Sequence, residues 1–335
     1  MRRTNFLFEL SGEHPSLPLA ELNACLFTIC KNFEFLENGP GFAIVRMDEN
    51  DLYPTISRLA LTHRVGEYLG SCRLDELKTF LIHLEIGPGS AAVRVKRYGG
   101  AGSPELANNI SRCVGEVISR TNKIDLTEPE QIIRVILGER LHFHIEKALV
   151  DRDQFERRHV RSRPFFSPVS LHPCYARALV NLTRIRPGET LLDPFCGTGG
   201  IVLEASLMGV RVIGTDASKE MIEGCKANLE HFGAPWLCLE RMDVGEVVEK
   251  FYEVDAVATD PPYGRSATTL KESVETLHKR GLEAIGKVLK SEGRAGIILP
   301  YQCNHTASLF LEQTHVQRVH RSLQRHYCLL RRRGL

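Results

Sequence analysis

The stretch TLLDPFCGTGG, residues 190–200, joins a short apolar strand to a glycine-rich turn and the start of a helix. Its glycines let the backbone turn tightly and approach a ligand closely, and the first amides of the following helix would face that ligand. A dinucleotide-binding G-x-G-x-x-G motif needs a third glycine where Val202 stands, so the stretch disfavours hydride-transfer chemistry. A tight turn without any ligand is the other interpretation.

On both sides of this stretch, apolar strands alternate with helices. Helices are predicted at 173–185, 200–208, 219–232, 245–251, 271–290 and 305–311, and strands at 190–193, 211–216, 236–240, 254–260, 294–299 and as a final pair. This alternation is typical of a parallel, doubly wound sheet. The sequence therefore predicts an α/β fold, with a doubly wound domain over residues 171–335.

Residues 1–150 have a mixed pattern instead. Strands are predicted at 4–10, 41–47, 64–70, 92–97, 125–127, 131–137 and 142–147, and helices at 18–31, 51–61, 74–82 and 104–120. We interpret this region as two α+β subdomains, 1–62 and 63–150. Residues 151–170 are arginine-rich and contain Pro164 and Pro168, which indicates a linker or a docking segment.

The composition restricts the class of protein. The 335 residues predict about two domains, and 43% hydrophobic with 25% charged residues excludes disorder as the main state. No apolar run approaches the roughly 18 residues of a membrane-spanning helix and the start is unlike a signal peptide, so we expect a cytosolic protein. The ten cysteines form no C-x-x-C pair, so neither a zinc site nor a disulfide framework is predicted and no metal is implied.

The charge is nearly balanced, with a formal net charge of +2. Residues 1–150 carry 17 basic and 19 acidic side chains, so their whole surface is not a polycation. Local basic clusters lie at Arg94, Lys96 and Arg97, between 152 and 163, and between 318 and 333. Such clusters contact phosphates or form a solvated face.

Acidic residues follow the strands of the predicted sheet. Asp216 ends a strand 23 residues after Asp193, where a carboxylate can accept both hydroxyls of a ribose. Asp243 follows the next strand and can accept from an adenine amine, or it is a solvated loop residue. Ligands of open α/β sheets bind at the carboxyl ends of the strands.

The motif DPPYG, residues 260–264, ends a further strand at the same edge. Asp260 supplies a carboxylate acceptor, and two consecutive prolines stiffen the loop and leave the Pro261 carbonyl as a second acceptor. Tyr263 offers a flat face on which a base can stack. Two acceptors on an exocyclic base amine would favour the pyramidal geometry that exposes its lone pair to an activated methyl group. A merely rigid turn explains the double proline, but not the acid and the aromatic ring together.

Residues 165–330 resemble the Rossmann-fold methyltransferases that use S-adenosylmethionine and carry the D-P-P-Y signature of amino-group methylation. The motifs PFFSP (164–168), LHP (171–173), DPFCGTGG (193–200) and TDPPYGRS (259–266) are similar to those of the archaeal and eukaryotic tRNA guanosine-10 N2-methyltransferases. That family carries a ferredoxin-like unit and a THUMP domain before the catalytic domain, which fits residues 1–62 and 63–150 in length and pattern.

The resemblance implies a site. Asp260, Pro261, Pro262 and Tyr263 would be catalytic. The cofactor would contact Phe166, Ser167, His172, Asp193, Pro194, Phe195, Cys196, Gly197, Thr198, Gly199, Asp216, Ala217, Asp243 and Val244. His172, beside Pro173, is equally a candidate for capping a helix. RNA would contact Arg94, Lys96, Arg97 and Arg265.

We therefore expect a monomeric cytosolic enzyme that methylates the exocyclic N2 amine of a guanosine in tRNA, at position 10, once or twice. One alternative is an adenine N6-methyltransferase acting on RNA or DNA, because the same acceptors suit a similar amine. Another is a non-catalytic RNA-binding protein with a vestigial cofactor fold, against which the complete D-P-P-Y motif argues.

Overall fold

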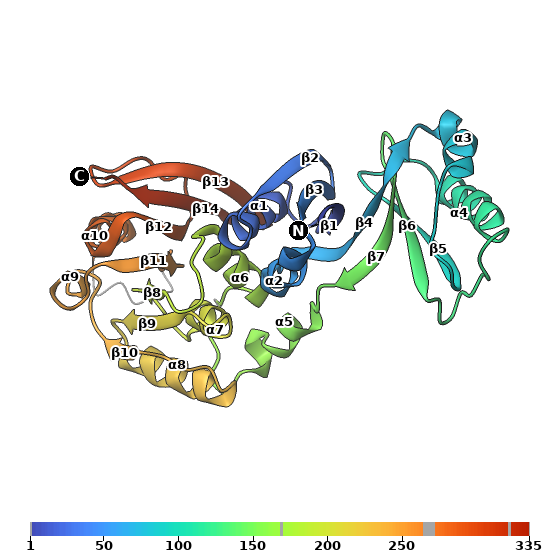
Figure 1. The fold of residues 1–335 in the computed structure, drawn as a ribbon. Coiled ribbons are helices and arrows are strands. Elements are labelled where there is room, and N and C mark those ends of the chain that lie inside the picture. The colour runs from blue at the N-terminus through green and yellow to red at the C-terminus, as the bar shows by residue number, and fades with distance from the viewer. Residues whose placement is uncertain (1, 168–169, 264–271, 321–322, 335) are drawn as a thin grey trace. The chain divides into compact units, whose positions relative to one another are not determined.

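The computed structural model describes residues 2–167, 170–263, 272–320 and 323–334 (Figure 1). The chain forms two compact units. The first comprises the residues up to Leu19 with Ile29–Ser57 and Thr62–Val150, and the second comprises Ala20–Thr28, Arg58–Leu61 and the residues from Asp151 onward. The second unit thus takes two short segments from the first sixty residues. None of the described helices combines the length and apolarity that crossing a membrane requires.

The first unit is built on a seven-stranded sheet. In spatial order its strands are β2 (Phe33–Gly39), β3 (Phe42–Asp48), β1 (Arg3–Leu10), β4 (Thr62–Cys72), β7 (Leu141–Leu149), β6 (Gln131–Leu137) and β5 (Ala91–Arg97). All neighbours are antiparallel except β5 and β6. The long strand β4 pairs with β1 near its start and with β7 along most of its length, so the sheet is continuous.

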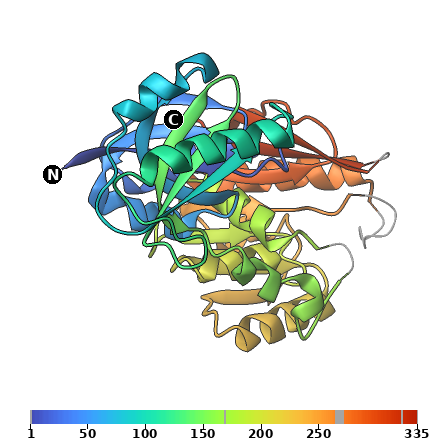
Figure 2. The ribbon, with the colours of Figure 1, turned by 90° about the vertical axis from the view of Figure 1, so that its right-hand side faces the viewer.

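Short helices accompany this sheet: α1 (Leu17–Ile29), η1 (Glu49–Asp51), α2 (Leu52–Arg58), η2 (Leu74–Glu76), α3 (Leu77–Ile82) and α4 (Pro104–Ile118). Helix α4 begins at Ser103, whose hydroxyl accepts from the Leu106 amide, and Pro104 occupies the first turn. Its buried face, Ile110, Val114 and Ile118, packs into a core with β5, β6 and β7. Helices α3 and α4 cover the same face of that part of the sheet (Figure 2).

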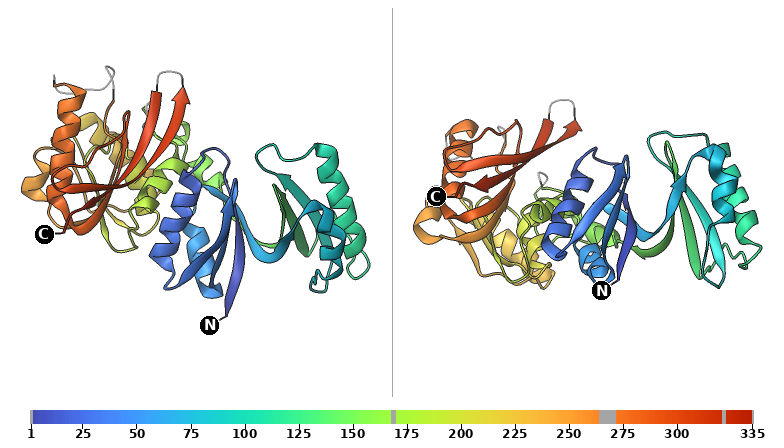
Figure 3. Two further views of the ribbon diagram at one scale, coloured as in Figure 1. Left: turned by 90° about the horizontal axis from the view of Figure 1, so that it is seen from above. Right: turned by 45° about the horizontal axis from the view of Figure 1, so that its top comes forward.

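The second unit contains the doubly wound sheet. Its strands, in spatial order, are β10 (Cys238–Arg241), β9 (Arg211–Asp216), β8 (Thr190–Asp193), β11 (Val254–Thr259), β12 (Leu289–Leu299), β14 (Leu323–Arg332) and β13 (Leu309–His320). The first five are parallel, and β14 runs antiparallel to both of its neighbours. Figure 3 shows β13 and β14 as a long two-stranded ribbon at the sheet edge. The order in which successive strands are added reverses between the parallel neighbours β8 and β11, which places a binding crevice at their carboxyl ends.

The helices of this unit are α5 (Asp153–Arg157), η3 (Val160–Ser162), α6 (Pro173–Leu182), α7 (Gly200–Ser206), α8 (Lys219–His231), α9 (Val247–Lys250) and α10 (Val274–Val288). The core between α10 and the sheet contains Val257, Ile285, Val288 and Ile297, all at most 2% exposed. The part of the predicted linker at 153–163 is packed here, because Phe155 on α5 is fully buried and Arg158 and Arg163 are also buried.

Two sequence predictions of secondary structure were wrong, and one strand was not predicted. No helix forms at 305–311, where β13 begins at Leu309. Residues 125–127 form a turn in which the Asp125 side chain accepts from the amides of Thr127 and Glu128. Strand β2 was missed, since most of its side chains are exposed and its apolar pattern is weak.

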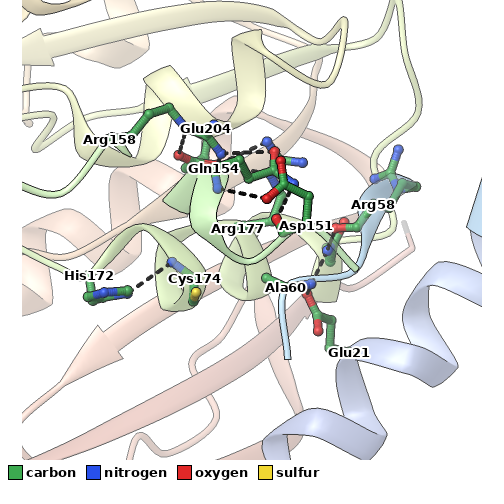
Figure 4. A network of polar contacts seen from close by, with 11 residues as sticks. Glu21, Arg58, Ala60, Asp151, Gln154, Arg158, His172, Cys174, Arg177 and Glu204 are labelled. Atoms are coloured by element: carbon green, nitrogen blue, oxygen red, sulfur yellow. Dashed lines mark hydrogen bonds and ion pairs between the residues drawn. The ribbon is translucent and has the colours of Figure 1, made fainter. Parts of the chain in front are cut away.

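A buried ionic cluster joins α5, α6 and α7 (Figure 4). Glu204 on α7 is fully buried and lies 2.7 Å from Arg158 Nε and 2.9 Å from Arg177 Nη2. Because a buried carboxylate must be paired, this cluster fixes α7, the helix that follows the glycine loop, against α5 and α6.

The two N-terminal segments of the second unit meet at Glu21 (Figure 4). This buried carboxylate accepts from the amides of Ala60 at 3.0 Å and Leu61 at 2.8 Å, and from the Asn181 side chain at 2.9 Å. Arg58 donates to the Ile185 carbonyl at 2.7 Å. We call Glu21, Arg58, Ala60, Leu61 and Asn181 the N-terminal joint. It holds segments 20–28 and 58–61 on α6.

Candidate active site

The glycine loop after β8 has the conformation that its sequence predicts. Gly197 and Gly199 have φ values of 49° and 84°, in the left-handed region that favours glycine. A Cβ on Gly199 would lie 2.6 Å from Cys225 Sγ, so no side chain fits there. A Cβ on Gly197 would meet no described atom within 4 Å, so the backbone at Gly197 is open to a ligand.

Asp193 and Asp216 hold this loop in place. Asp193 is 1% exposed, and its Oδ1 accepts from the Phe195 amide at 3.1 Å and the Thr259 hydroxyl at 2.6 Å. Burial raises the pKa of Asp193 to about 7. Its contacts tie β8 to β11, so this side chain has a clear structural role.

Asp216, at the end of β9, accepts from the Gly197 amide at 3.0 Å and from the Ser218 amide at 2.9 Å. Burial raises the pKa of Asp216. Each carboxylate oxygen accepts one backbone hydrogen bond and can accept two, so each keeps a position for a ribose hydroxyl. The open backbone at Gly197 and the free acceptor positions of Asp216 therefore fit an adenosine-bearing cofactor.

Other residues of the predicted cofactor site have side chains that face the protein. Phe195 packs on the core and against Gly281. Cys196 is buried beside Cys225, which together with burial raises the pKa of Cys196. Val244 is 2% exposed within the core. The Ala217 carbonyl accepts from Arg241 Nε at 3.1 Å.

The segment before α6 lies against the glycine loop. Asn228 on α8 exchanges hydrogen bonds with the Phe165 backbone at 3.0 and 2.7 Å, and it also donates to the Thr198 carbonyl at 2.9 Å. Ser170 Oγ is 3.3 Å from Thr198 Oγ1 and donates to the Ser167 carbonyl. Phe166, in the same segment, is 61% exposed. Asn228 thus ties the Phe165 segment to the glycine loop, and no sequence motif indicated this contact.

His172 caps α6, because its Nδ1 accepts from the Cys174 amide at 3.3 Å. Its Nε2 lies 3.2 Å from Glu156 on α5. The structure thus shows the capping contact that was one of two interpretations of this histidine.

Asp243 has a strong partner that the sequence did not reveal. Arg280 on α10 donates to Oδ1 at 2.7 and 3.0 Å and to Oδ2 at 2.9 Å, and the Gly245 amide also donates to Oδ1. This bidentate pair leaves less acceptor capacity for an adenine amine than a free loop carboxylate would have.

The DPPY motif follows β11 at the same sheet edge. Oδ1 of Asp260 is buried and has no hydrogen-bond partner among the residues that the structure describes. Burial raises the pKa of Asp260 to about 7, against the opposing effects of Arg325 and of a hydrogen bond from Tyr263. A buried acceptor without a donor is costly, so this oxygen is suited to a donor that a substrate brings.

Two side chains hold the rest of the motif. His278 on α10 is 2% exposed; its Nε2 lies 2.9 Å from the Pro262 carbonyl and its Nδ1 lies 2.8 Å from the Tyr301 hydroxyl. Arg325 Nε on β14 donates to the Tyr263 hydroxyl at 2.8 Å. Because His278 occupies the Pro262 carbonyl, the Pro261 carbonyl is the candidate for a second acceptor.

The basic residues predicted to bind RNA belong to the first unit, apart from Arg265, which lies outside the described residues. Arg94 donates to the Leu126 carbonyl at 2.9 Å and Arg97 to the Gly102 carbonyl at 3.0 Å. Lys96 Nζ lies 3.4 Å from the fully buried Glu9 and 4.5 Å above the Tyr98 ring. The charge of Lys96 is therefore partly compensated within the protein.

Comparisons with known proteins show what this chain is similar to. Residues 160–331 match a family described as "RMKL-like, methyltransferase domain". The chain is 33% identical to the tRNA (guanine(10)-N2)-dimethyltransferase of Methanothermobacter thermautotrophicus, over 94% of this chain and 96% of the relative. It is also 33% identical to the enzyme of that name from Pyrococcus abyssi, over 98% and 100% of the two chains.

The fold is similar to that of TrmN from Thermus thermophilus. The TM-score is 0.58 at 23% identity, and the match covers 98% of this chain and 99% of the other. The likeness extends over both units and not only over the glycine loop and the DPPY motif.

Proposed function

The chain belongs to the tRNA (guanine(10)-N2)-dimethyltransferase family, and from this premise we propose that it methylates the exocyclic N2 amine of guanosine 10 in tRNA twice, with S-adenosylmethionine as methyl donor. The buried Oδ1 of Asp260, at the carboxyl end of β11, is the observation that carries the proposal. It supplies the acceptor that an amine nucleophile requires.

The donor would be held where backbone and acceptors are available. We propose that its amino-acid part lies along the backbone at Gly197 and that its ribose hydroxyls donate to Asp216. S-adenosylmethionine supplies an electrophilic methyl group on a sulfonium centre. The contacts of Asn228 with Phe165 and Thr198 hold the flanking segment against the loop and would help to exclude water.

The amine would be activated by acceptors. The lone pair of a guanine amine is delocalised into the ring, and hydrogen bonds from its two hydrogens to Asp260 and to the Pro261 carbonyl favour a pyramidal nitrogen. Tyr263 would stack on the base and orient the amine toward the methyl group. The nitrogen–carbon bond forms as the sulfur–carbon bond breaks, and the amine releases one proton to Asp260 or to water.

A second methylation is compatible with the same acceptors. After one transfer the amine keeps a single N–H, and Asp260 is sufficient to accept the hydrogen bond from it. The second unit therefore needs no additional group for the second step, and the proposed product is N2,N2-dimethylguanosine.

We further propose that the first unit holds another part of the tRNA. A catalytic site that reads one extruded base cannot by itself select one guanosine in a folded RNA. A second contact with the tRNA must therefore determine which nucleotide reaches the catalytic site. Arg94 and Arg97 on the edge strand β5 are the candidates for phosphate contacts.

The test uses unmodified tRNA, the full chain and S-adenosylmethionine, followed by nucleoside digestion and mass spectrometry. We expect N2-methylguanosine early and N2,N2-dimethylguanosine at completion, with neither product from a tRNA that has adenosine at position 10. N6-methyladenosine would identify the adenine-methylating alternative, and the absence of any methylated nucleoside would support the non-catalytic one.

A further inference from the structure

We propose that Arg325 is a positioning residue of the methyl-transfer site, which fixes the Tyr263 ring through its hydroxyl and keeps Asp260 in the form that accepts the amine. This inference rests on the proposed function. Arg325 lies 62 residues from Tyr263 in sequence, and neither the D-P-P-Y motif nor the spacing of the acidic residues points to it.

The geometry places Arg325 at the motif. It lies on β14, and its Nε donates to the Tyr263 hydroxyl at 2.8 Å. Arg325 is partly buried, pairs with Gln317 on β13, and directly precedes the part of β14 that also pairs with β12, which begins at His326. Two residues along, Tyr327 is fully buried and donates to Gln317 at 2.8 Å. A donor on so well-anchored a strand restricts the ring of Tyr263, whose own loop contains two prolines without backbone donors.

The charges around Asp260 give Arg325 a second effect. Among the residues that the structure describes, the titratable groups that act on this carboxylate are Asp193 on β8, Tyr263 on the loop, and Arg325 and Tyr327 on β14. Asp193 and Asp260 raise the cost of ionising each other. Among these groups Arg325 carries the positive charge and favours the ionised form of Asp260. A protonated Asp260 would turn one of its acceptor oxygens into a donor and lose the amine.

Arginine suits both tasks better than lysine. Its guanidinium stays charged at every accessible pH and presents donors in a fixed plane, whereas the lysine ammonium is a flexible point charge. A substitution by lysine therefore separates the charge of Arg325 from its geometry.

The experiment measures single-turnover methylation of tRNA against pH for the full chain and its variants, at saturating S-adenosylmethionine and tRNA. The acid limb is the part of the pH–rate profile in which the rate rises with pH. For Arg325→Met we expect this limb to move up by about one pH unit and the rate at pH 7 to fall roughly tenfold. For Arg325→Lys we expect the limb to stay within a few tenths of a pH unit of the wild-type value while the rate falls. Calorimetry should give both variants the wild-type affinity for S-adenosylmethionine within twofold.

Three further variants serve as controls. Arg318→Met removes an exposed cation from the same ribbon and should leave the acid limb in place. On a Tyr263→Phe background, Arg325→Lys should cost less than it does alone, because the hydroxyl through which Arg325 acts is gone. If Arg325→Met does not fold, Arg325→Gln keeps a donor for Tyr263 and should still move the limb.

The outcomes separate the two proposals. A wild-type chain that does not methylate the guanosine amine overturns the proposed function. If the wild-type chain is active, two results overturn only the role of Arg325. The first is that Arg325→Met or Arg325→Gln leaves the acid limb of the pH–rate profile unmoved. The second is that the affinity of these variants for S-adenosylmethionine falls together with the rate.

Discussion

Asp260 combines a buried site with a task that requires its ionised form. Because burial raises its pKa to about 7, we expect methylation to rise with pH through that value and to fall as Asp260 becomes protonated below it. Asp260→Asn should lower the single-turnover rate by roughly a hundredfold or more and abolish this acid limb, while cofactor affinity stays nearly intact. Equal losses of rate and of cofactor affinity would make Asp260 a binding or folding residue.

Asp216 has two partners besides the expected ribose. Asp216→Ala removes the acceptor for those hydroxyls and leaves the amides of Gly197 and Ser218 without their partner. We expect cofactor binding to weaken by about 2–4 kcal/mol, as measured by calorimetry. Asp216→Asn keeps one acceptor oxygen and should lose less. Unchanged affinity in the alanine variant would contradict the assignment.

The residues that the sequence identified share a position. Asp193 and Asp216 end apolar strands and Asp260 directly follows one. Because parallel strands bring such residues to one edge of the sheet, spacing along the chain is enough to predict that they lie at that edge. His278, Arg280 and Arg325 come from α10 and β14, and their contacts depend on how these elements rotate and pack. Periodicity predicts which face of a helix is buried. It does not predict that a polar side chain on that face, such as His278, will contact a particular loop atom, such as the Pro262 carbonyl oxygen.

Among the helices, α10 supports the DPPY loop through His278. Burial lowers the pKa of His278, so the folded protein holds it neutral. The pKa of this histidine in the unfolded chain is near 6.5, so its contribution to the free energy of unfolding is fully present above that pH. The contribution is lost as the pH falls from there through the lower pKa of the folded protein.

His278→Phe should therefore destabilise the protein by about 1–3 kcal/mol at pH 7, since the Pro262 carbonyl loses its donor. Denaturant unfolding measures this loss, and methylation should fall in parallel. Tyr301→Phe removes the hydroxyl that contacts His278 Nδ1 and keeps the contact of His278 with Pro262. It should lower the free energy of unfolding by less than about 1 kcal/mol. Equal losses in the two variants would show that the Pro262 contact is not the important one.

Strand and helix prediction succeeded where the pattern was strong. The buried parallel strands β8, β9 and β11 are apolar runs flanked by helices, and they fall within a residue or two of the predicted ranges. Residues 305–311 have a helical spacing of apolar residues, yet only Leu309 is fully buried, and the ribbon pairing with β14 determines the conformation. Pairing between distant segments is the information that local periodicity lacks.

Considering the whole chain, the first unit should contribute affinity and the second chemistry. The paired substitution Arg94→Ala with Arg97→Ala removes two cations from β5. We expect weaker tRNA binding and an unchanged affinity for S-adenosylmethionine. The slope of the logarithm of the tRNA binding constant against the logarithm of the salt concentration should become shallower by about one to two. Lys78→Ala, on the exposed face of α3, is the matched control. Wild-type tRNA affinity in the double variant would exclude β5 as a contact surface.

The N-terminal joint holds segments 20–28 and 58–61 within the second unit. Burial raises the pKa of Glu21 to about 7, so its ionised form depends on the amides of Ala60 and Leu61 and on Asn181. Glu21→Ala removes the acceptor of the Ala60 and Leu61 amides and one of the two acceptors of the Asn181 side chain, and we expect a loss of about 3 kcal/mol in the free energy of unfolding. Glu283→Ala, an exposed glutamate on α10, should change the stability by less than about 0.5 kcal/mol. A comparable effect of the two variants would show that the joint adds little.

The same joint constrains how the chain folds while it is being made. Asn181 leaves the ribosome 160 residues after Glu21, which at about 5–20 residues per second is a delay on the order of ten to thirty seconds. During that interval segments 20–28 and 58–61 have been synthesised without the helix that covers them. A stalled nascent chain that ends near residue 150 should expose them to proteases and chaperones, and this exposure should end only when α6 has emerged.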